Sequence, residues 1–259
     1  KVLFMSFILL LVALIGCSGG SNSDQNTSSD NEQGEENNGN SEETLVIKAA
    51  NAYPPNEILA QGYYVFEEIV KEKSEGRIEL EYVGGPETIP PFELGESLRT
   101  GVVDMMINAA AYYTDQVPEA LALSYSELTT KEENEGEAID FLNEIHNEKL
   151  NAQLISRMSE TGFHLYTKEP VETIEDLKGM RLRGTPTYRL VIEAVGGAMV
   201  SMPGGEIYTA LERGVIDGYG WVSSGITDAG LHEHTSSIVG PKFFRGDIVL
   251  AFNLDFWNE

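Results

Sequence analysis

The sequence is poor in the residues that several kinds of linkage and binding require. Cys17 is the only cysteine among 259 residues, so no disulfide can form within the chain. Basic residues are also scarce, since 17 Lys and Arg stand against 42 Asp and Glu, a net charge of −25. So acidic a chain argues against nucleic acid and against broad contact with anionic lipid heads. A small anionic ligand stays compatible with it, because one buried arginine can outweigh a screened, distant field.

Long hydrophobic runs are lacking too, apart from one at the start. Val2–Ile15 is almost wholly apolar but too short to span a bilayer as a stable anchor. It runs into Leu14-Ile15-Gly16-Cys17, the small-residue pattern of a bacterial lipoprotein cleavage site. We therefore expect residues 1–16 to be a signal peptide and Cys17 to be lipidated, which would hold the protein on the outer face of a membrane. Because the chain opens on a residue other than Met and stops just after an apolar stretch, we expect a fragment that misses both ends.

The segment after Cys17 has no hydrophobic side chains. Residues 18–43 carry seven acidic residues and no basic or apolar one. Such a segment cannot bury enough surface to fold, so residues 17–43 are predicted to be a solvated tether. Without Lys1 and this tether, 35 acidic and 16 basic residues remain, a net charge of −19.

From Thr44 onward, strand and helix patterns alternate. Apolar runs predict strands at 45–50, 78–82, 163–167, 181–183 and 247–253. Helical spacing predicts helices at 58–70, 92–99, 131–149, 174–178, 188–195 and 207–213. The first is expected to be capped by Asn56 and closed by Gly76, and the short helix at 174–178 is preceded by Thr173 and ended by Gly179. The helix at 131–149 has an apolar face of Ala138, Phe141, Leu142 and Ile145. The βαβαβ order at the start favours a mainly parallel sheet.

A seven-residue phrase occurs twice in this region. Leu98-Arg99-Thr100-Gly101-Val102-Val103-Asp104 is echoed by Leu211-Glu212-Arg213-Gly214-Val215-Ile216-Asp217. In both, a helix ends at a glycine, which accepts the left-handed conformation, and an apolar strand follows. Such junctions are common, so coincidence is the alternative. Two related copies predict an α/β fold of two periplasmic-binding-protein-like lobes with a hinged cleft, where ligands favour strand carboxyl ends.

The predicted lobes divide the chain into consecutive parts. Lobe I is expected at 44–162 and lobe II at 163–245, with residues 246–259 returning into lobe I. The chain would thus cross between lobes near 156–168 and again near 244–248. Two crossings are typical of hinged clefts.

Arg183 is the first candidate for the chemistry of this cleft. Period-two alternation places Arg181 and Arg183 on one face of a short strand, so one could bind ligand while the other is solvated. A guanidinium offers two parallel hydrogen bonds to a carboxylate. The alternative is a surface salt bridge in an acidic protein.

Aromatic residues supply the other candidates. Tyr219-Gly220-Trp221 follows the second echo, and its glycine is expected to leave room for a ligand between two flat walls. The pair Tyr112-Tyr113 follows the first echo in the same way, and Tyr113 is the one we select. Tyr53 lies between the first strand and first helix, while Tyr208 either faces the site or packs inside its helix. Burial in the core is the competing interpretation for all these rings.

One pair of residues suggests a metal. His232 and His234 flank Glu233, and two histidines at this spacing can share a metal in a strand but diverge on a helix. No third ligand is readable nearby, and no nucleophile elbow or phosphate-binding glycine loop occurs. The pattern favours a solvated helix end and no metal site.

From Glu175 to Trp221 the chain resembles the extracytoplasmic solute receptors of TRAP transporters, of the DctP type. The residues that carry the resemblance are Asp176-Leu177-Lys178-Gly179-Met180-Arg181-Leu182-Arg183 and Gly204-Gly205-Glu206-Ile207-Tyr208-Thr209-Ala210-Leu211-Glu212-Arg213-Gly214-Val215-Ile216-Asp217-Gly218. Lys73-Ser74-Glu75-Gly76-Arg77-Ile78 and Gly101-Val102-Val103-Asp104-Met105 fit as well. The resemblance extends over nearly all of 44–259.

The resemblance implies two lobes that close on an organic acid and deliver it to a membrane permease. It also implies that Arg183 pairs with the substrate carboxylate. Trp221 keeps the aromatic residue of the oxo-acid and hydroxy-acid branch. Gly220 stands where some of those relatives have a carboxylate that holds a metal ion, so direct binding without a cofactor is expected. The C-terminal helices that brace the lobes in this family would be missing.

The sequence therefore predicts a lipid-anchored receptor for a small carboxylate, not an enzyme. The predicted site consists of Arg183, Trp221, Tyr219, Tyr53, Tyr113 and Tyr208. Two alternatives stay open: a sensor that reports the ligand to a membrane partner, and a surface hydrolase with a metal on His232 and His234.

Overall fold

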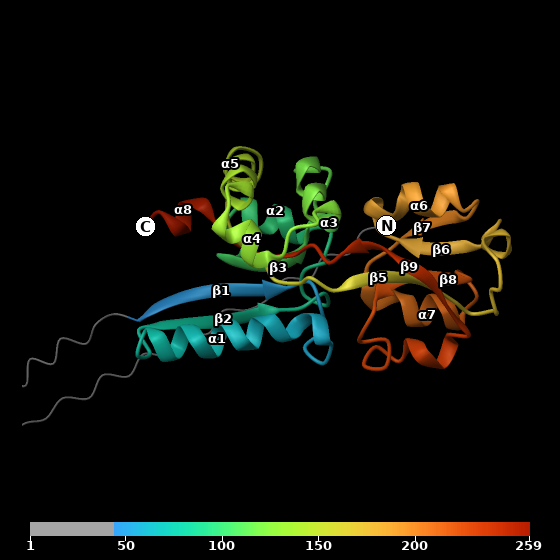
Figure 1. Cartoon of the computed structure of the whole chain (residues 1–259). Helices are drawn as coiled ribbons and strands as arrows, with labels where there is room; N and C mark the ends of the chain where they lie inside the picture. The colour runs from blue at the N-terminus through green and yellow to red at the C-terminus, as the bar shows by residue number, and fades with distance from the viewer. Residues whose placement is uncertain (1–43) are drawn as a thin grey trace, which may run out of the picture. The chain divides into compact units, whose positions relative to one another are not determined.

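The computed structural model describes residues 44–259. The predicted signal peptide, Cys17 and the tether lie outside the described residues. Residues 44–259 belong to one compact unit. It holds two five-stranded sheets with separate apolar cores, which we call lobe I and lobe II (Figure 1). The predicted two-lobed α/β fold is confirmed.

Lobe I is built on a sheet with the strand order β2-β1-β3-β10-β4. Its strands are β1 (Leu45–Asn51), β2 (Ile78–Gly84), β3 (Met105–Ala109), β4 (Ala152–Arg157) and β10 (Ile248–Asn253). Its helices are α1 (Gln61–Lys73), α2 (Leu94–Arg99), α3 (Ala122–Tyr125), α4 (Thr130–Glu135), α5 (Ala138–Leu150) and α8 (Leu254–Trp257). Helix α1 lies along one face of the sheet, and α2 and α5 lie on the other (Figure 1).

Lobe II has the strand order β7-β6-β8-β5-β9. Its strands are β5 (Gly162–Thr167), β6 (Arg181–Gly184), β7 (Ala198–Ser201), β8 (Gly218–Val222) and β9 (Ser237–Arg245). Its helices are α6 (Arg189–Ala194) and α7 (Ile207–Glu212), on opposite faces of the sheet (Figure 1). Residue Leu59 of lobe I packs against the cores of both lobes.

Both sheets are mixed, which corrects the expectation of a mainly parallel sheet. In lobe I, β1 is parallel to β2 and β3, whereas β10 is antiparallel to both β3 and β4. In lobe II, β6 is parallel to β7 and β8, whereas β5 is antiparallel to β8 and β9. The antiparallel strands are those reached when the chain crosses between lobes, because a crossing strand enters the sheet from the opposite end.

The repeated phrase has the same geometry in both lobes. Gly101 and Gly214 have φ of 74° and 64°, the left-handed region that favours glycine. Asp104 Oδ2 accepts from Lys48 N of β1 at 2.8 Å, and Asp217 Oδ2 accepts from Arg181 N of β6 at 2.8 Å. Each aspartate thereby fastens the start of its strand to the neighbouring parallel strand. The repeat is structural, and it sets β3 beside β1 and β8 beside β6.

Three local predictions were wrong. The helix expected at 131–149 is divided into α4 and α5 at Gly136, because the backbone of Gly136 is extended, with φ of −100° and ψ of −171°. Phe141 does not lie on a buried face but is 63% exposed. Asn56 does not cap α1, which begins at Gln61 after a 3-10 turn at Ile58–Ala60.

Two short segments link the lobes. Residues 158–161 lead from β4 to β5, and residues 246–247 lead from β9 to β10. They lie side by side, since Gly246 N donates to Thr161 O at 2.7 Å and Met158 N donates to Ile248 O at 2.6 Å. Paired connections of this kind are where a hinge between lobes can act. The domain boundaries given above stay predictions.

Within residues 44–259, no helix combines the length and the apolar character that crossing a membrane requires.

Candidate functional site

Arg183 is the charged centre of the site. It lies in β6, where its backbone pairs with Val200 of β7 and Tyr219 of β8, and only 1% of it is exposed. Its Nε donates to Met202 O at 2.9 Å and its Nη1 to Gly220 O at 3.2 Å. These carbonyls of lobe II fix the direction of the guanidinium. In the part of the chain that the structure describes, no carboxylate lies within ion-pair distance of it.

A buried guanidinium without a carboxylate partner is costly. Carbonyl and hydroxyl oxygens satisfy its N–H groups but do not neutralise its charge. Arg181, two residues earlier, shows the contrast: its guanidinium pairs with Asp217 at 2.6 Å, and its side chain is 46% exposed. Of the two arginines, Arg181 forms the ordinary solvated salt bridge and Arg183 has positive charge to offer to an anion.

Tyr112 reaches Arg183 from the other lobe. It ends the 3-10 turn Ala110–Tyr112 that follows β3 in lobe I. Its hydroxyl accepts from Arg183 Nη2 at 3.4 Å and from Gly204 N at 3.3 Å, both in lobe II. An edge-to-face contact with Phe92, 4.9 Å between ring centroids, supports the ring. The hydroxyl is thus a bridge between the lobes at the arginine.

Trp221 of β8 packs beside Arg183. The Arg183 Cζ atom lies 5.8 Å from the indole centroid, within the range of a cation–π interaction. The ring packs so closely on Gly204 that a Cβ there would lie 2.7 Å from Cη2. The indole is 3% exposed, and its Nε1 has no hydrogen-bond partner.

Tyr53 lies on the lobe I side of the same site. It is 5% exposed, and its ring centroid is 6.5 Å from that of Tyr112. Burial raises the pKa of its phenol well above 10, with Tyr112 adding to the rise and Arg183 opposing it. The neutral hydroxyl of Tyr53 therefore lies within the electrostatic reach of Arg183.

The structure does not bring the other predicted residues to Arg183 through any hydrogen bond. Tyr113 is fully buried in lobe I and bonds His146 Nε2 at 3.1 Å. Tyr219 stacks on Tyr166, and its hydroxyl bonds Thr235 Oγ1 at 2.7 Å. Tyr208 donates to Glu233 Oε2 at 3.1 Å. Each hydroxyl has a partner of its own, so a binding role for these three tyrosines stays a prediction without a contact that supports it.

Two residues near Arg183 were not among the candidates. Tyr188 is 2% exposed, and its ring occupies the space beside Gly220, where a Cβ would lie 2.3 Å from Tyr188 Cε2. Gly220 thus makes room for Tyr188 and not for a ligand, which corrects the expectation above. Glu57, in the loop after β1, is 6% exposed, and its Oε2 has no partner. No local pattern marked either residue, because their relation to Arg183 depends on contacts between distant segments.

The histidine pair does not resemble a metal centre. His232 and His234 lie in a 3-10 turn, Leu231–His234, not in a strand. The ring of His234 packs 5.1 Å from that of Tyr208. Over residues 44–259, no group of three or more His, Cys, Asp or Glu side chains is arranged to hold a metal ion.

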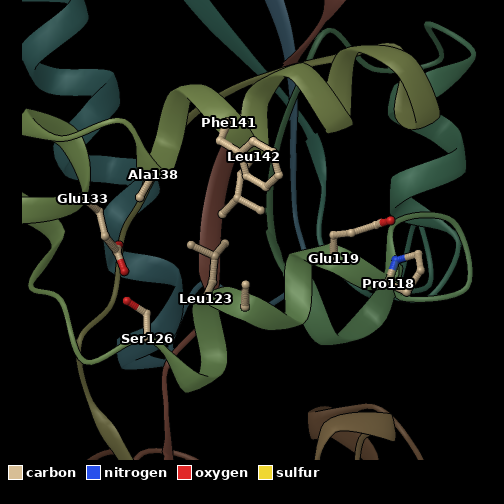
Figure 2. A pocket seen from close by; sticks show the side chains of 9 residues that line it. Pro118, Glu119, Leu123, Ser126, Glu133, Ala138, Phe141 and Leu142 are labelled. Carbon is tan, nitrogen blue, oxygen red and sulfur yellow. The ribbon is translucent and has the colours of Figure 1, made fainter.

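A separate pocket of about 460 Å³ lies in lobe I, between α3 with the turn before it and the α4–α5 region (Figure 2). Leu123, Phe141 and Leu142 give it an apolar interior, and Glu119 and Glu133 lie among its lining residues. Glu133 is buried beside Arg157, with 2.9 Å between Oε2 and Nε. None of the residues that surround Arg183 line this pocket.

Comparison with known proteins gives a family match over most of the chain. The model of the family "bacterial extracellular solute-binding protein, family 7" (DctP) matches residues 49–259. A monocarboxylate 2-oxoacid-binding periplasmic protein of Nostoc sp. is 27% identical over 203 residues, which cover 73% of this chain and 55% of that protein. The chain spans between 35% and 55% of the length of the first three curated relatives it matches.

Solved structures share the fold. A TRAP periplasmic solute-binding protein from Desulfovibrio desulfuricans, with bound sn-glycerol-3-phosphate, is 25% identical with a TM-score of 0.75 and covers 83% of this chain and 71% of its own. Another from Desulfovibrio salexigens, with bound orotic acid, is 20% identical with a TM-score of 0.74 and the same coverage.

Proposed function

Because the chain belongs to family 7 of the bacterial extracellular solute-binding proteins, we propose that it captures a small organic acid between its lobes and delivers it to a TRAP-type membrane permease. The observation that carries the proposal is the buried guanidinium of Arg183, which has carbonyl and hydroxyl acceptors but no carboxylate partner among residues 44–259. A ligand carboxylate would supply the missing negative charge.

The position of Arg183 links binding to closure. Its guanidinium belongs to lobe II, and the Tyr112 hydroxyl beside it belongs to lobe I. A ligand held by the arginine and contacting lobe I would interact better with the closed arrangement than with an open one. Ligand would therefore shift the population toward the closed state. Trp221 would wall the site, and Tyr53 would contribute a neutral hydroxyl.

The ligands of relatives agree with an anionic substrate. The Desulfovibrio proteins hold a phosphate ester and orotic acid, and the Nostoc protein is a 2-oxoacid binder. We propose direct binding by Arg183 without a metal cofactor. Attachment to the outer face of the membrane through lipidated Cys17 is part of the same proposal, since a tethered receptor stays close to its permease.

A thermal-shift screen of the intact chain tests this function. A series of organic acids, sugars and short peptides is added, and the melting temperature is measured. At 100 times its Kd, a ligand stabilises by about 2.7 kcal/mol, which raises Tm by several degrees in a protein of this size. We expect an organic acid to give this shift; a shift by a sugar or peptide and by no acid would overturn the proposal.

Arg183→Ala is the matching variant, and Arg181→Ala is its control. The first removes the buried guanidinium and the second an exposed one that pairs with Asp217. Arg183→Ala should weaken binding of the acid by about 100-fold or more, since a buried charge pair is lost. Arg181→Ala should leave the Kd within about twofold. Equal affinity of the Arg183→Ala protein for the acid would remove this residue from the site.

A further inference from the structure

Two polar groups that interact electrostatically with Arg183 are buried without hydrogen-bond partners. They are Glu57 Oε2, which accepts, and Trp221 Nε1, which donates. Glu57 is 6% exposed and Trp221 is 3% exposed, and they belong to opposite lobes. A buried polar atom left unpaired costs about 1–3 kcal/mol, so two of them at one binding site indicate groups that a ligand satisfies.

The two groups lie in one neighbourhood. A Cβ placed on Gly225 would lie 2.6 Å from Cγ2 of Ile58, the residue after Glu57, and 3.9 Å from Trp221 Nε1. The segment that carries Glu57 therefore reaches the polar edge of the indole. The same indole has the Arg183 guanidinium 5.8 Å from its centroid. Arg183, Trp221 and Glu57 form a set of a cation, a donor and an acceptor.

Oxo, ammonium and hydroxyl groups on a ligand differ in how well they pair with Trp221 Nε1 and the Glu57 carboxylate. At a pH above its pKa Glu57 is ionised, and an oxo group, which accepts from the indole N–H, gives nothing to that carboxylate. An ammonium group donates to Glu57 but cannot accept from Trp221. A hydroxyl group donates and accepts, and it needs no charge of its own.

We propose that the substrate is a hydroxycarboxylate and that Glu57 determines this specificity by accepting a hydrogen bond from the ligand hydroxyl. Arg183 holds the carboxylate, and Trp221 Nε1 donates to a ligand oxygen. The proposal rests on the proposed function and adds the second recognition group of the substrate.

The electrostatics of Glu57 agree with this role. Burial raises the pKa of Glu57 to about 7, the positive charge of Arg183 partly offsets the rise, and Asp228 adds to it. A donor on the ligand would stabilise the carboxylate, which within residues 44–259 has one oxygen without any partner.

Titration calorimetry on the intact chain with two matched sets of acids tests the proposal. One set is lactate, pyruvate, propionate and alanine, and the other is malate, oxaloacetate, succinate and aspartate. Within the set that binds, the hydroxy acid should bind about tenfold or more tightly than its oxo, deoxy and amino counterparts. A preference for the oxo, deoxy or amino acid would overturn the proposal.

Variants of Glu57 separate specificity from folding. Glu57→Leu should reduce the preference for hydroxy over deoxy acid to about twofold or less without weakening the binding of the deoxy acid. Glu57→Gln, which keeps an acceptor oxygen, should retain part of the preference. Asp228→Asn is the control, because Asp228 influences Glu57 but is exposed, and it should keep the full preference.

The failures of the two proposals are distinguishable. If acids bind through Arg183 but the Glu57→Leu and Glu57→Gln proteins both keep the full hydroxy preference, Glu57 has no such role and the receptor function stands. If no acid of any kind binds to the intact chain, the proposed function fails together with this inference.

Discussion

At the scale of single residues, Tyr112 joins the two lobes, and the adjacent Tyr113 does not. Tyr113 therefore serves as a control for substitutions of Tyr112. Tyr112 accepts hydrogen bonds from Arg183 and Gly204 across the interface, whereas Tyr113 bonds His146 inside lobe I. Both rings are buried. The two adjacent side chains thus serve different parts of the molecule, one the contact with Arg183 between the lobes and one the core of lobe I.

Tyr112→Phe should weaken ligand binding, because the hydroxyl that joins the lobes is lost while the ring stays. One net hydrogen bond of about 0.5–1.5 kcal/mol corresponds to a 2- to 12-fold rise in Kd for the acid, measured by calorimetry. Tyr113→Phe should lower the free energy of unfolding by a similar amount and leave the Kd unchanged. The reverse pattern would contradict the assignment of the bridge to Tyr112.

Arg183 could be selected as a candidate from the sequence because its strand and family motif are local. The choice between Tyr112 and Tyr113 could not, since the chain leaves β3 in a 3-10 turn where alternation no longer indicates direction. Glu57 and Tyr188 carry no local signal. Their place beside the site follows from how the loop after β1 and the turn before α6 pack against distant strands.

At the scale of elements, the repeated helix–glycine–strand junction depends on backbone conformation more than on space. A Cβ on Gly214 would meet no atom within 4 Å, and one on Gly101 would meet only Asn253 Nδ2 at 4.0 Å. Both have positive φ. Substitution at either position is therefore penalised by the left-handed conformation itself.

Gly214→Ala and Gly101→Ala should each lower the free energy of unfolding by about 1 kcal/mol, measured by urea denaturation. Gly205→Ala is the control, because Gly205 has open space around its Cβ position and is not among the glycines with positive φ. It should change stability by less than about 0.5 kcal/mol. Equal effects at all three glycines would show that the left-handed conformation does not govern the junctions.

The central strands of lobe II were predictable because they are apolar runs, but its two edge strands were not. β7 and β9 lie at the two edges of the lobe II sheet, and β9 contains Gly240 and Pro241. Edge strands tolerate polar residues and proline, so their sequences carry a weak strand signal. Gly136, which divides α4 from α5, likewise lay within a helical pattern that continued on both sides.

At the scale of the whole molecule, Asp247 ties the second crossing segment to the turn that carries Tyr112. Its Oδ2 accepts from Ala111 N at 3.0 Å and from Ser124 Oγ at 2.9 Å. Its carbonyl accepts from Ala110 N at 3.0 Å. Burial raises the pKa of Asp247 to about 6, against hydrogen bonds from Ser124 and Ala111 that lower it.

This raised pKa gives a stability difference with a definite sign. A carboxyl group whose pKa is higher in the folded state than its unfolded value of 3.8 stabilises the fold at pH values below 3.8. This contribution is lost as the pH rises through the folded-state pKa of about 6. Asp247→Asn keeps the single acceptor oxygen and has no titration. The unfolding free energy of the original protein, relative to Asp247→Asn, should fall by about 2 kcal/mol between pH 4 and 7. A difference that is flat over this range would refute the raised pKa.

Local sequence patterns could not predict that both sheets mix parallel and antiparallel strands. The sequence correctly indicated βαβ units, but β10 returns from lobe II and lies antiparallel between β3 and β4. That insertion joins residues about 140 positions apart, as the register of Val249 with Asn108 illustrates. Only long-range pairing decides it.

A crystal structure of the intact chain with its acid bound tests the claim about Arg183 most directly. We expect one carboxylate of the ligand to lie within 3.2 Å of the Arg183 guanidinium and to contact residues of both lobes. A bound acid located elsewhere, with Arg183 still directed only to the carbonyls of Met202 and Gly220 and to Tyr112, would contradict the central role of this arginine.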